Sequence, residues 1–155
     1  MVRGGQQPVV GANVVLYAAG SGGYGSTNTT QLSSTVTSGA GGSFSITGLY
    51  TCPSASAQMY LVATGGDSGA GFNSSLALMA ALGSCGNLSS STFANIDEVT
   101  TVAAVYALAP FMATNGGAPG ASIGTSGTNS QGLTQAFATA NNLVNTCLLY
   151  TSRCV

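Results

Sequence analysis

Two serines of this chain lie in sequence patterns that nucleophilic enzymes use. Ser122 is the centre of Gly-Ala-Ser-Ile-Gly, a G-x-S-x-G pentapeptide, and Ser68 lies in Gly-Asp-Ser-Gly. A serine hydroxyl attacks a carbonyl group only when a neighbouring base, normally His, takes its proton. The chain contains no His, and Pro119 and Gly127 indicate a loop around Ser122. We therefore predict that neither serine is catalytic.

Asp67 offers the strongest enzymatic alternative. The run Asp-Ser-Gly-Ala at 67–70 resembles the triplet of aspartic proteases, in which two carboxyl groups share one proton. A homodimer could supply one such Asp from each copy. The preceding residues, Thr-Gly-Gly at 64–66, are not the apolar strand that this site requires. We favour a glycine-rich loop after a strand, and we keep a homodimeric aspartic protease as the less favoured hypothesis.

The other two acidic residues favour a structural role. Asp97 and Glu98 are adjacent, so on a helix their side chains diverge by about 100° and cannot converge as a glycosidase pair. Asn95 is followed three residues later by Glu98, which fits a capping box at the start of a helix. We therefore predict a helix cap formed by Asn95 and Glu98.

No cofactor or metal site is predicted. Gly20, Gly22 and Gly25 form G-x-G-x-x-G, but a dinucleotide site needs a helix directly after this loop, and Ser-Thr-Asn-Thr-Thr follows instead. Metal sites need clustered His, Cys or acidic ligands, whereas the three acids are scattered and His is absent. An ordinary flexible loop accounts for the glycines.

The composition excludes several classes of partner. Charged residues make up 3% of the chain, against about 25% in an average protein, and the formal net charge is -1. Without a basic patch the protein cannot neutralise phosphates, so nucleic-acid binding is excluded. Ser, Thr, Asn and Gln must hydrate the surface, a composition typical of exported bacterial surface proteins. The longest apolar stretch, 102–113, is shorter than the roughly 20 residues that span a membrane, so membrane insertion is not predicted.

The two ends of the sequence favour a fragment of a metagenomic gene. The first residues, Met-Val-Arg-Gly-Gly-Gln-Gln-Pro, lack the apolar region of a signal peptide, although the composition favours an extracellular or cell-envelope location. Residues 147–155, Cys-Leu-Leu-Tyr-Thr-Ser-Arg-Cys-Val, resemble the translation of two facing transposon mosaic ends from a sequencing library. We interpret 147–155 as a non-native tail and exclude it from the fold.

Excluding the tail leaves two cysteines, Cys52 and Cys85. Each lies at the end of a predicted element, where two segments of chain can approach, and an exported protein favours oxidised cysteines. We predict a disulfide between them, with buried free thiols as the alternative.

Four segments of the first half have the alternation or β-branched content of strands: 8–19, 31–38, 43–49 and 57–66. Glycine-rich segments separate them, and Gly11 within the first allows a turn or bulge. Short strands at this spacing predict an antiparallel β-sandwich.

The order of these strands resembles a known family. Pro-Val-Val-Gly-Ala-Asn-Val at 8–14, Ser-Gly-Ala-Gly-Gly-Ser-Phe at 38–44 and Met-Tyr-Leu-Val at 59–62 are similar to carboxypeptidase regulatory-like modules, prealbumin-like or immunoglobulin-like sandwiches of bacterial surface proteins. Ser38 replaces the Asp that is usual at the hairpin. The resemblance covers about 2–66. It implies a non-catalytic spacer, adhesion unit or accessory domain, and it transfers no catalytic residues.

The second half predicts a hairpin and two helices. Segment 75–82 fits a strand or a helix, and we favour a strand that a turn at 85–91 joins to a short partner strand at 91–96. A helix begins near 96 and Pro110 can kink or end it, and a last helix at 133–146 follows a loop. The predicted class is therefore α+β, with a sandwich module and added hairpin at 1–96 and a helical extension at 97–146.

These observations predict a non-enzymatic structural or adhesive module of an exported bacterial protein. The alternative is a carbohydrate-binding accessory module, because a polar, uncharged surface suits sugars. An exposed row of Tyr17, Tyr24 or Tyr50 would favour sugar binding, and burial of these rings would favour a spacer. The partners implied are polysaccharide or other cell-surface protein domains.

Overall fold

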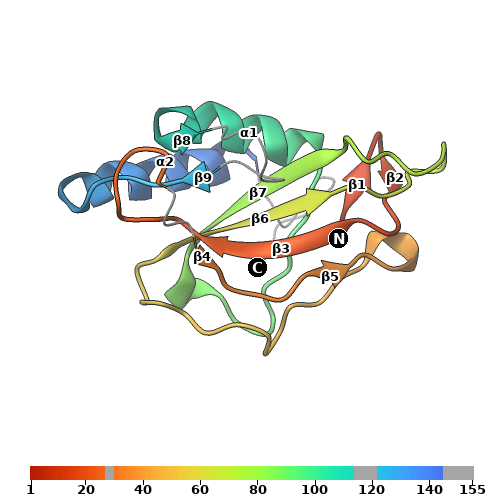
Figure 1. The fold of residues 1–155 in the computed structure, drawn as a ribbon, viewed down its shortest axis with the longest axis horizontal. Helices are drawn as coiled ribbons and strands as arrows, with labels where there is room; N and C mark the ends of the chain where they lie inside the picture. The colour runs from red at the N-terminus through yellow and green to blue at the C-terminus, as the bar shows by residue number, and fades with distance from the viewer. Residues whose placement is uncertain (27–29, 114–121, 145–155) are drawn as a thin grey trace.

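The centre of the molecule is a five-stranded antiparallel sheet (Figure 1). The computed structural model describes residues 1–26, 30–113 and 122–144. The strand order is β4 (Thr30–Gln31), β3 (Asn13–Ala18), β6 (Gln58–Thr64) and β7 (Ala77–Ser84), and β5 (Val36–Thr37) pairs with the other end of β3.

β6 lies inside this sheet because its residues are apolar on both faces. Met59, Leu61 and Ala63 face one side and Tyr60 and Val62 the other, and all five are buried. Antiparallel ladders pair it with β3 and with β7. Such two-sided burial is expected for a central strand that is covered on both faces. The strands predicted at 57–66 and 75–82 are confirmed.

Two helices cover one face of the sheet (Figure 1). They are α1 (Glu98–Leu108), which continues into the 3-10 turn η3 (Ala109–Phe111), and α2 (Ser130–Leu143). Both predicted helices are confirmed. α1 ends at Leu108, and Pro110 lies in the 3-10 turn that follows. Residues 145–146 of the predicted 133–146 helix lie outside the described part of the chain. The helix-side core consists of Tyr60, Val62, Met79, Ala81, Ala104, Leu108, Ile123, Leu133, Ala136, Phe137 and Ala140.

The opposite face of the sheet packs against irregular segments. This second core joins inward residues of β3, β6 and β7 to Val2, Val9, Ile46 and Ile96. The α+β class is therefore confirmed, but the immunoglobulin-like sandwich is not. In a sandwich, a second sheet would cover one face of the first. Within the described residues, helices cover one face of this sheet and loops cover the other.

The strand predicted at 43–49 is wrong, although Phe44 and Ile46 do turn toward the core. Its backbone bonds locally: the Leu49 amide donates to the Ile46 carbonyl at 3.0 Å, and the Ser43 carbonyl accepts from Gly39 at 2.8 Å. These local bonds belong to turns around η1 (Ala40–Gly42) and Gly48, and they replace a ladder.

Of two further strand predictions, one is corrected in part and the other is wrong. The segment 31–38 contributes only the two-residue strands β4 and β5, because Ser33 between them uses its hydroxyl to accept from the Leu16 amide at 3.0 Å. The partner strand at 91–96 is wrong, since Ile96 forms an isolated parallel bridge with Val2.

The smaller elements complete the fold. They are β1 (Arg3–Gly4) with β2 (Gln7–Pro8), β8 (Met112–Ala113) with β9 (Ser122–Ile123), η2 (Cys85–Asn87) and η4 (Gly127–Asn129).

Candidate functional site: a groove beside the disulfide

A half-open groove of about 940 Å³ lies on the face of the sheet that the helices leave uncovered. Leu16, Leu61 and Leu82 on the strands form its floor. One wall is the segment 44–52, and the other is the segment 88–95 together with Met1 and Arg3. Neither wall is a regular strand, so the hydrogen bonds and the disulfide that fix each wall decide whether the groove has a defined shape.

The disulfide between Cys52 and Cys85 anchors the first wall. The two Cα atoms are 5.9 Å apart, within the range for a bridge, and the predicted pairing is confirmed. Two backbone bonds continue the attachment: the Cys85 amide donates to Ala57 at 2.8 Å, and the Gly86 amide donates to Ala55 at 2.9 Å. The end of the 44–52 wall is thereby fixed to the end of β7.

The first residues of the chain anchor the second wall. The Met1 amino group donates to the Ala94 carbonyl at 2.6 Å, and the Ile96 amide donates back to Met1 at 2.9 Å. Arg3 continues this pairing by donating to Ile96 at 2.9 Å. Burial, and secondarily the positive charge of Arg3, lowers the pKa of the Met1 amino group to about 6. A neutral amine is therefore the favoured form at neutral pH.

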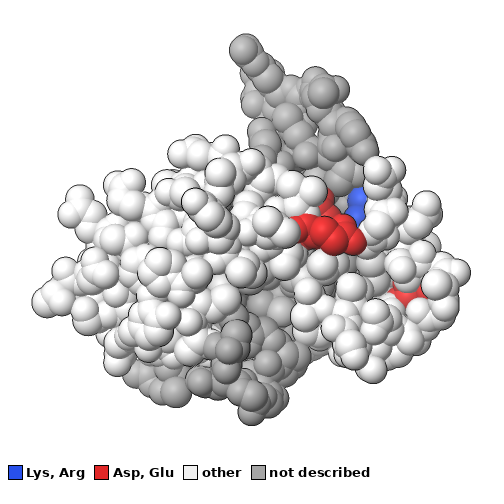
Figure 2. All heavy atoms as spheres, turned by 90° about the horizontal axis from the view of Figure 1, so that it is seen from above, with Lys and Arg blue, Asp and Glu red and all other residues white. Residues whose placement is uncertain are grey.

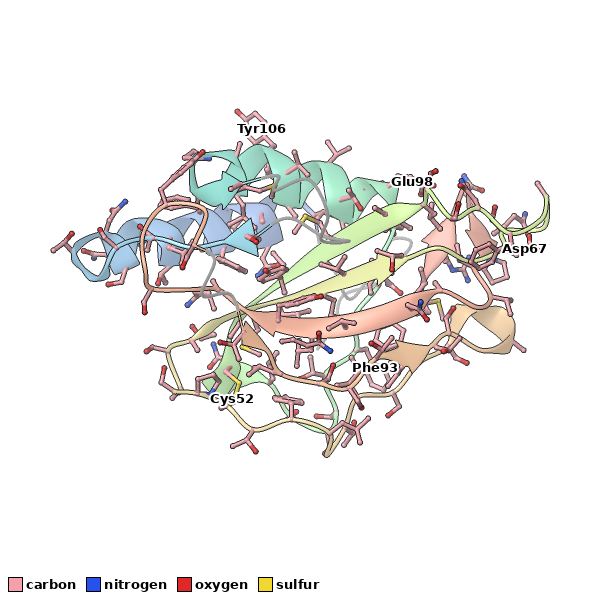
Figure 3. All side chains as sticks on the ribbon, in the orientation of Figure 1. Cys52, Asp67, Phe93, Glu98 and Tyr106 are labelled. Atoms are coloured by element: carbon pink, nitrogen blue, oxygen red, sulfur yellow. A yellow bond between two sulfur atoms is a disulfide. The ribbon has the colours of Figure 1, made fainter. Side chains whose placement is uncertain are left out.

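The groove offers aromatic rings and hydroxyl groups. Phe44 and Tyr50 come from the first wall, and Phe93 stands at the rim of the second, where 76% of it is exposed. Figure 3 shows Phe93 and Cys52 on the side of the sheet away from the helices. The hydroxyl-bearing residues are Ser45, Thr47, Ser89, Ser90 and Thr92. Among the described residues that line the groove there is no carboxylate side chain, and Arg3 is the one that carries a charge.

The three tyrosines proposed as a sugar-binding row do not lie together. Tyr50 lines the groove, but Tyr17 packs on the helix side of the sheet, where its ring stacks on Tyr60 with centroids 5.5 Å apart. Burial raises the pKa of Tyr17. Tyr24 is exposed, and its hydroxyl donates to the Ala109 carbonyl at 3.1 Å. A row across one face is therefore excluded.

The predicted cap of the first long helix is corrected by two residues. Asp97 is the N-cap: its carboxylate accepts from the Thr100 amide at 2.8 Å, and the Thr100 hydroxyl accepts from the Asp97 amide at 2.9 Å. Glu98 is the first helical residue, and its carboxylate accepts from the Gly5 amide at 2.6 Å. Asn95 lies in the groove wall. The run Asp-Glu-Val-Thr carried the signal, because Thr can take the N3 role that Glu usually plays.

Asp67 organises its own loop. One carboxylate oxygen accepts from the Gly69 amide at 2.7 Å and from the Gly71 amide at 2.9 Å, and the backbone pairs with Val10 and Phe72. This geometry matches an Asx turn. The glycine-rich loop interpretation therefore has a direct structural basis.

The remaining motif residues also have places in the fold. Ser122 lies in β9 opposite Ala113. Gly20 bridges to Gly124 and Gly22 to Ser126, so the glycine loop pairs with a neighbouring segment. Within residues 1–26, 30–113 and 122–144, no group of His, Cys, Asp or Glu could hold a metal ion. None of the helices in these ranges is long and apolar enough to cross a membrane.

The groove wall at 88–95 is the feature that the sequence interpretation missed. The sequence feature that could have indicated it is a Ser- and Thr-rich run followed by Phe93, which we had assigned to a turn and a short strand. Comparison of the chain with protein-family models, with curated proteins and with solved structures found no match.

Proposed function

We propose that this chain is a non-enzymatic adhesive module of an exported bacterial protein and that its groove binds neutral carbohydrate. The observation that carries this proposal is the groove itself, whose walls combine three aromatic side chains with five Ser and Thr residues around an apolar floor. Its volume of about 940 Å³ lies at the upper end of the range typical of ligand sites, about 300 to 1,000 Å³.

The lining chemistry suits a sugar better than the other common ligand classes. A sugar ring has an apolar C–H face that packs on an aromatic ring, and hydroxyls that exchange hydrogen bonds with Ser and Thr. An anionic polymer would be expected to need several cations, whereas Arg3 is the single charged side chain that lines the groove. A cationic ligand would be left without a carboxylate partner.

Two observations support export. Disulfides persist mainly in oxidising compartments outside the cytosol, and Cys52–Cys85 is such a bond. The resemblance of residues 2–66 to carboxypeptidase regulatory-like surface modules points to the same location and to the same non-catalytic role. The whole protein's membership of that family and its extracellular location are part of this proposal.

A purely structural spacer is the second candidate. It is favoured by the separation of Tyr17, Tyr24 and Tyr50, which share no common surface. A spacer needs a stable fold but no ligand, so the two roles differ in whether the groove retains a glycan.

Affinity electrophoresis in gels that contain a neutral soluble polysaccharide tests the proposal. Xylan, mannan, β-glucan and a soluble cellulose derivative are compared, with heparin as the charged reference. We expect retardation by at least one neutral polymer and none by heparin. Retention by heparin alone, or by no neutral polymer in the series, would exclude carbohydrate binding in the groove and favour the spacer.

Matched variants locate the binding site. Phe93→Ala and Tyr50→Ala should each weaken retention about tenfold, because each removes a ring from the groove at a cost of about 1.4 kcal/mol. Phe72→Ala is the control, since Phe72 is an exposed phenylalanine outside the groove. Equal loss in all three variants would show that retention is not a property of the groove.

A further inference from the structure

The outer face of α1 is apolar from Val99 to Tyr106. Four side chains form it, and we call them the α1 stripe: Val99, Val102, Val105 and Tyr106, exposed by 62%, 68%, 44% and 74%. Figure 3 shows Tyr106 pointing away from the sheet. Their spacing of three, three and one residues keeps them on one side of the helix.

This pattern is the reverse of an ordinary surface helix. α1 turns Thr100, Ala103 and Ala104 toward the sheet, with Leu108 as its one large buried side chain, while the four larger residues of the α1 stripe face outward. A helix that is apolar all round is normally buried, and a contiguous exposed apolar patch normally marks an interaction site. α2, by contrast, exposes Gln135 and Thr139. The α1 stripe is therefore expected to be buried against another surface.

We propose that a second copy of this chain covers the α1 stripe, as a symmetric dimer. The charge distribution favours this occupant. In a two-fold interface the same surface patch lies on both sides, so a patch of one charge sign repels its copy, whereas an uncharged patch pairs with itself without that penalty. Figure 2, which looks down on the helices, shows no Lys, Arg, Asp or Glu over most of this face. The carboxylate of Glu98, at the start of α1, is held by the Gly5 amide of its own chain.

The spacing of the stripe suits an antiparallel pair of α1 helices. The midpoint between Val99 and Tyr106 falls between Val102 and Ala103, close to the middle of α1. In an antiparallel pair the small Val99 side chain therefore faces the large Tyr106 side chain of the second copy, and the two Val102 side chains meet at the axis. Such size complementarity is how side chains of packed helices interdigitate.

This dimer goes beyond the proposed function and does not depend on it. The α1 stripe and the groove lie on opposite sides of the sheet, so pairing through α1 leaves both grooves open. Loss of glycan binding in the groove variants would not alter the oligomeric state, and loss of the dimer would leave each groove intact. The two proposals can therefore fail separately.

Sedimentation velocity of the full chain between about 1 μM and 1 mM tests the dimer, because this range brackets moderate dissociation constants. We expect a concentration-dependent shift from monomer to dimer. Val102→Glu should raise the dissociation constant at least about 100-fold, because it buries two like charges at the axis. Glu is a good helix former at an exposed position, so the monomer should fold, as circular dichroism would verify. Ala138→Glu adds the same charge to an exposed position on α2 and should leave dimerisation unchanged.

Cysteine cross-linking tests the orientation independently, in a full chain with Cys147→Ser and Cys154→Ser. Val102→Cys should form an intermolecular disulfide, because the two copies of this position meet at the axis. Val99→Cys should not, because its two copies lie about 10 Å apart along the helices. A monomer throughout the concentration range, a dimer unaffected by Val102→Glu, or cross-linking at Val99 but not at Val102 would overturn the proposal.

Discussion

The disulfide between Cys52 and Cys85 is the one covalent cross-link, among the described residues, between the 44–52 wall of the groove and the end of β7. The bond closes a loop with a sequence separation of 33 residues, and in the chain-entropy model a loop of this length stabilises the fold by about 3.5 to 4 kcal/mol. Replacing both residues by Ala should lower the free energy of unfolding in urea by about that amount. Peptide mapping without reduction provides the direct check: separately alkylated Cys52 and Cys85 in folded protein would contradict the bond.

The Met1 amino group should make stability depend on pH. Its pKa in the folded chain, about 6, lies below its ordinary value of 8.0, so the unfolded chain binds the proton more readily. This contribution to stability is present above pH 8 and is lost as pH falls toward 6. Urea unfolding across that interval should therefore show that the free energy of unfolding decreases as the pH is lowered from 8 to 6.

The sequence provides a clean background for that measurement, because it contains no His that would titrate in the same interval. Acetylating the amino terminus removes the titrating group, and the acetylated chain should lose the pH dependence between 6 and 8. An unchanged slope after acetylation would assign the effect to another group.

The start of α1 distinguishes the observed Asp97 cap from the predicted Asn95 cap. Asp97→Ala should destabilise the protein by about 1 kcal/mol, because it leaves the Thr100 amide without its cap. Asn95→Ala is the matched control and should change the free energy of unfolding by less than about 0.5 kcal/mol, as expected for a residue outside the cap. Thermal or urea unfolding of both variants decides between them, and equal losses would contradict the Asp97 cap.

The elements that the sequence predicted well are those whose backbone partners are also regular. Alternation identified β6 and β7, and the spacing of Leu133, Phe137 and Ala140 identified α2, because burial and periodicity agree there. The segment 43–49 has the same alternation at Phe44 and Ile46, but turn bonds hold its backbone. Periodicity reports which side chains face the core and cannot report which strand, if any, accepts the backbone bonds.

The site was predictable only at its covalent anchor. The two cysteines could be paired from their number and from their places at the ends of elements. The groove between them could not, because its walls are irregular and are fixed by long-range bonds such as that from Met1 to Ala94, whose partners are 93 residues apart. The tyrosines misled for the same reason, since Tyr17 and Tyr50 lie on opposite faces of the sheet.

At the scale of the whole molecule, the helices complete the fold of the sheet. The predicted boundary after residue 96 would separate α1 and α2 from strands with which they share a core. Residues 1–96 expressed alone should therefore expose Tyr60, Val62 and Met79 and should show no cooperative unfolding transition, because the buried area of one face is lost. Residues 1–146 should unfold cooperatively. A sharp transition in the 1–96 fragment would support the two-unit division.

The uncharged surface over the helices in Figure 2 has a consequence for the surroundings in which this protein can work. Dissolved ions weaken attraction and repulsion between charges, and five charged side chains offer them little to act on. Fresh water and seawater should therefore leave the fold and its contacts nearly unchanged. With a formal net charge of -1, mutual repulsion contributes little to keeping molecules apart, so solubility depends on the hydration of hydroxyl and amide groups.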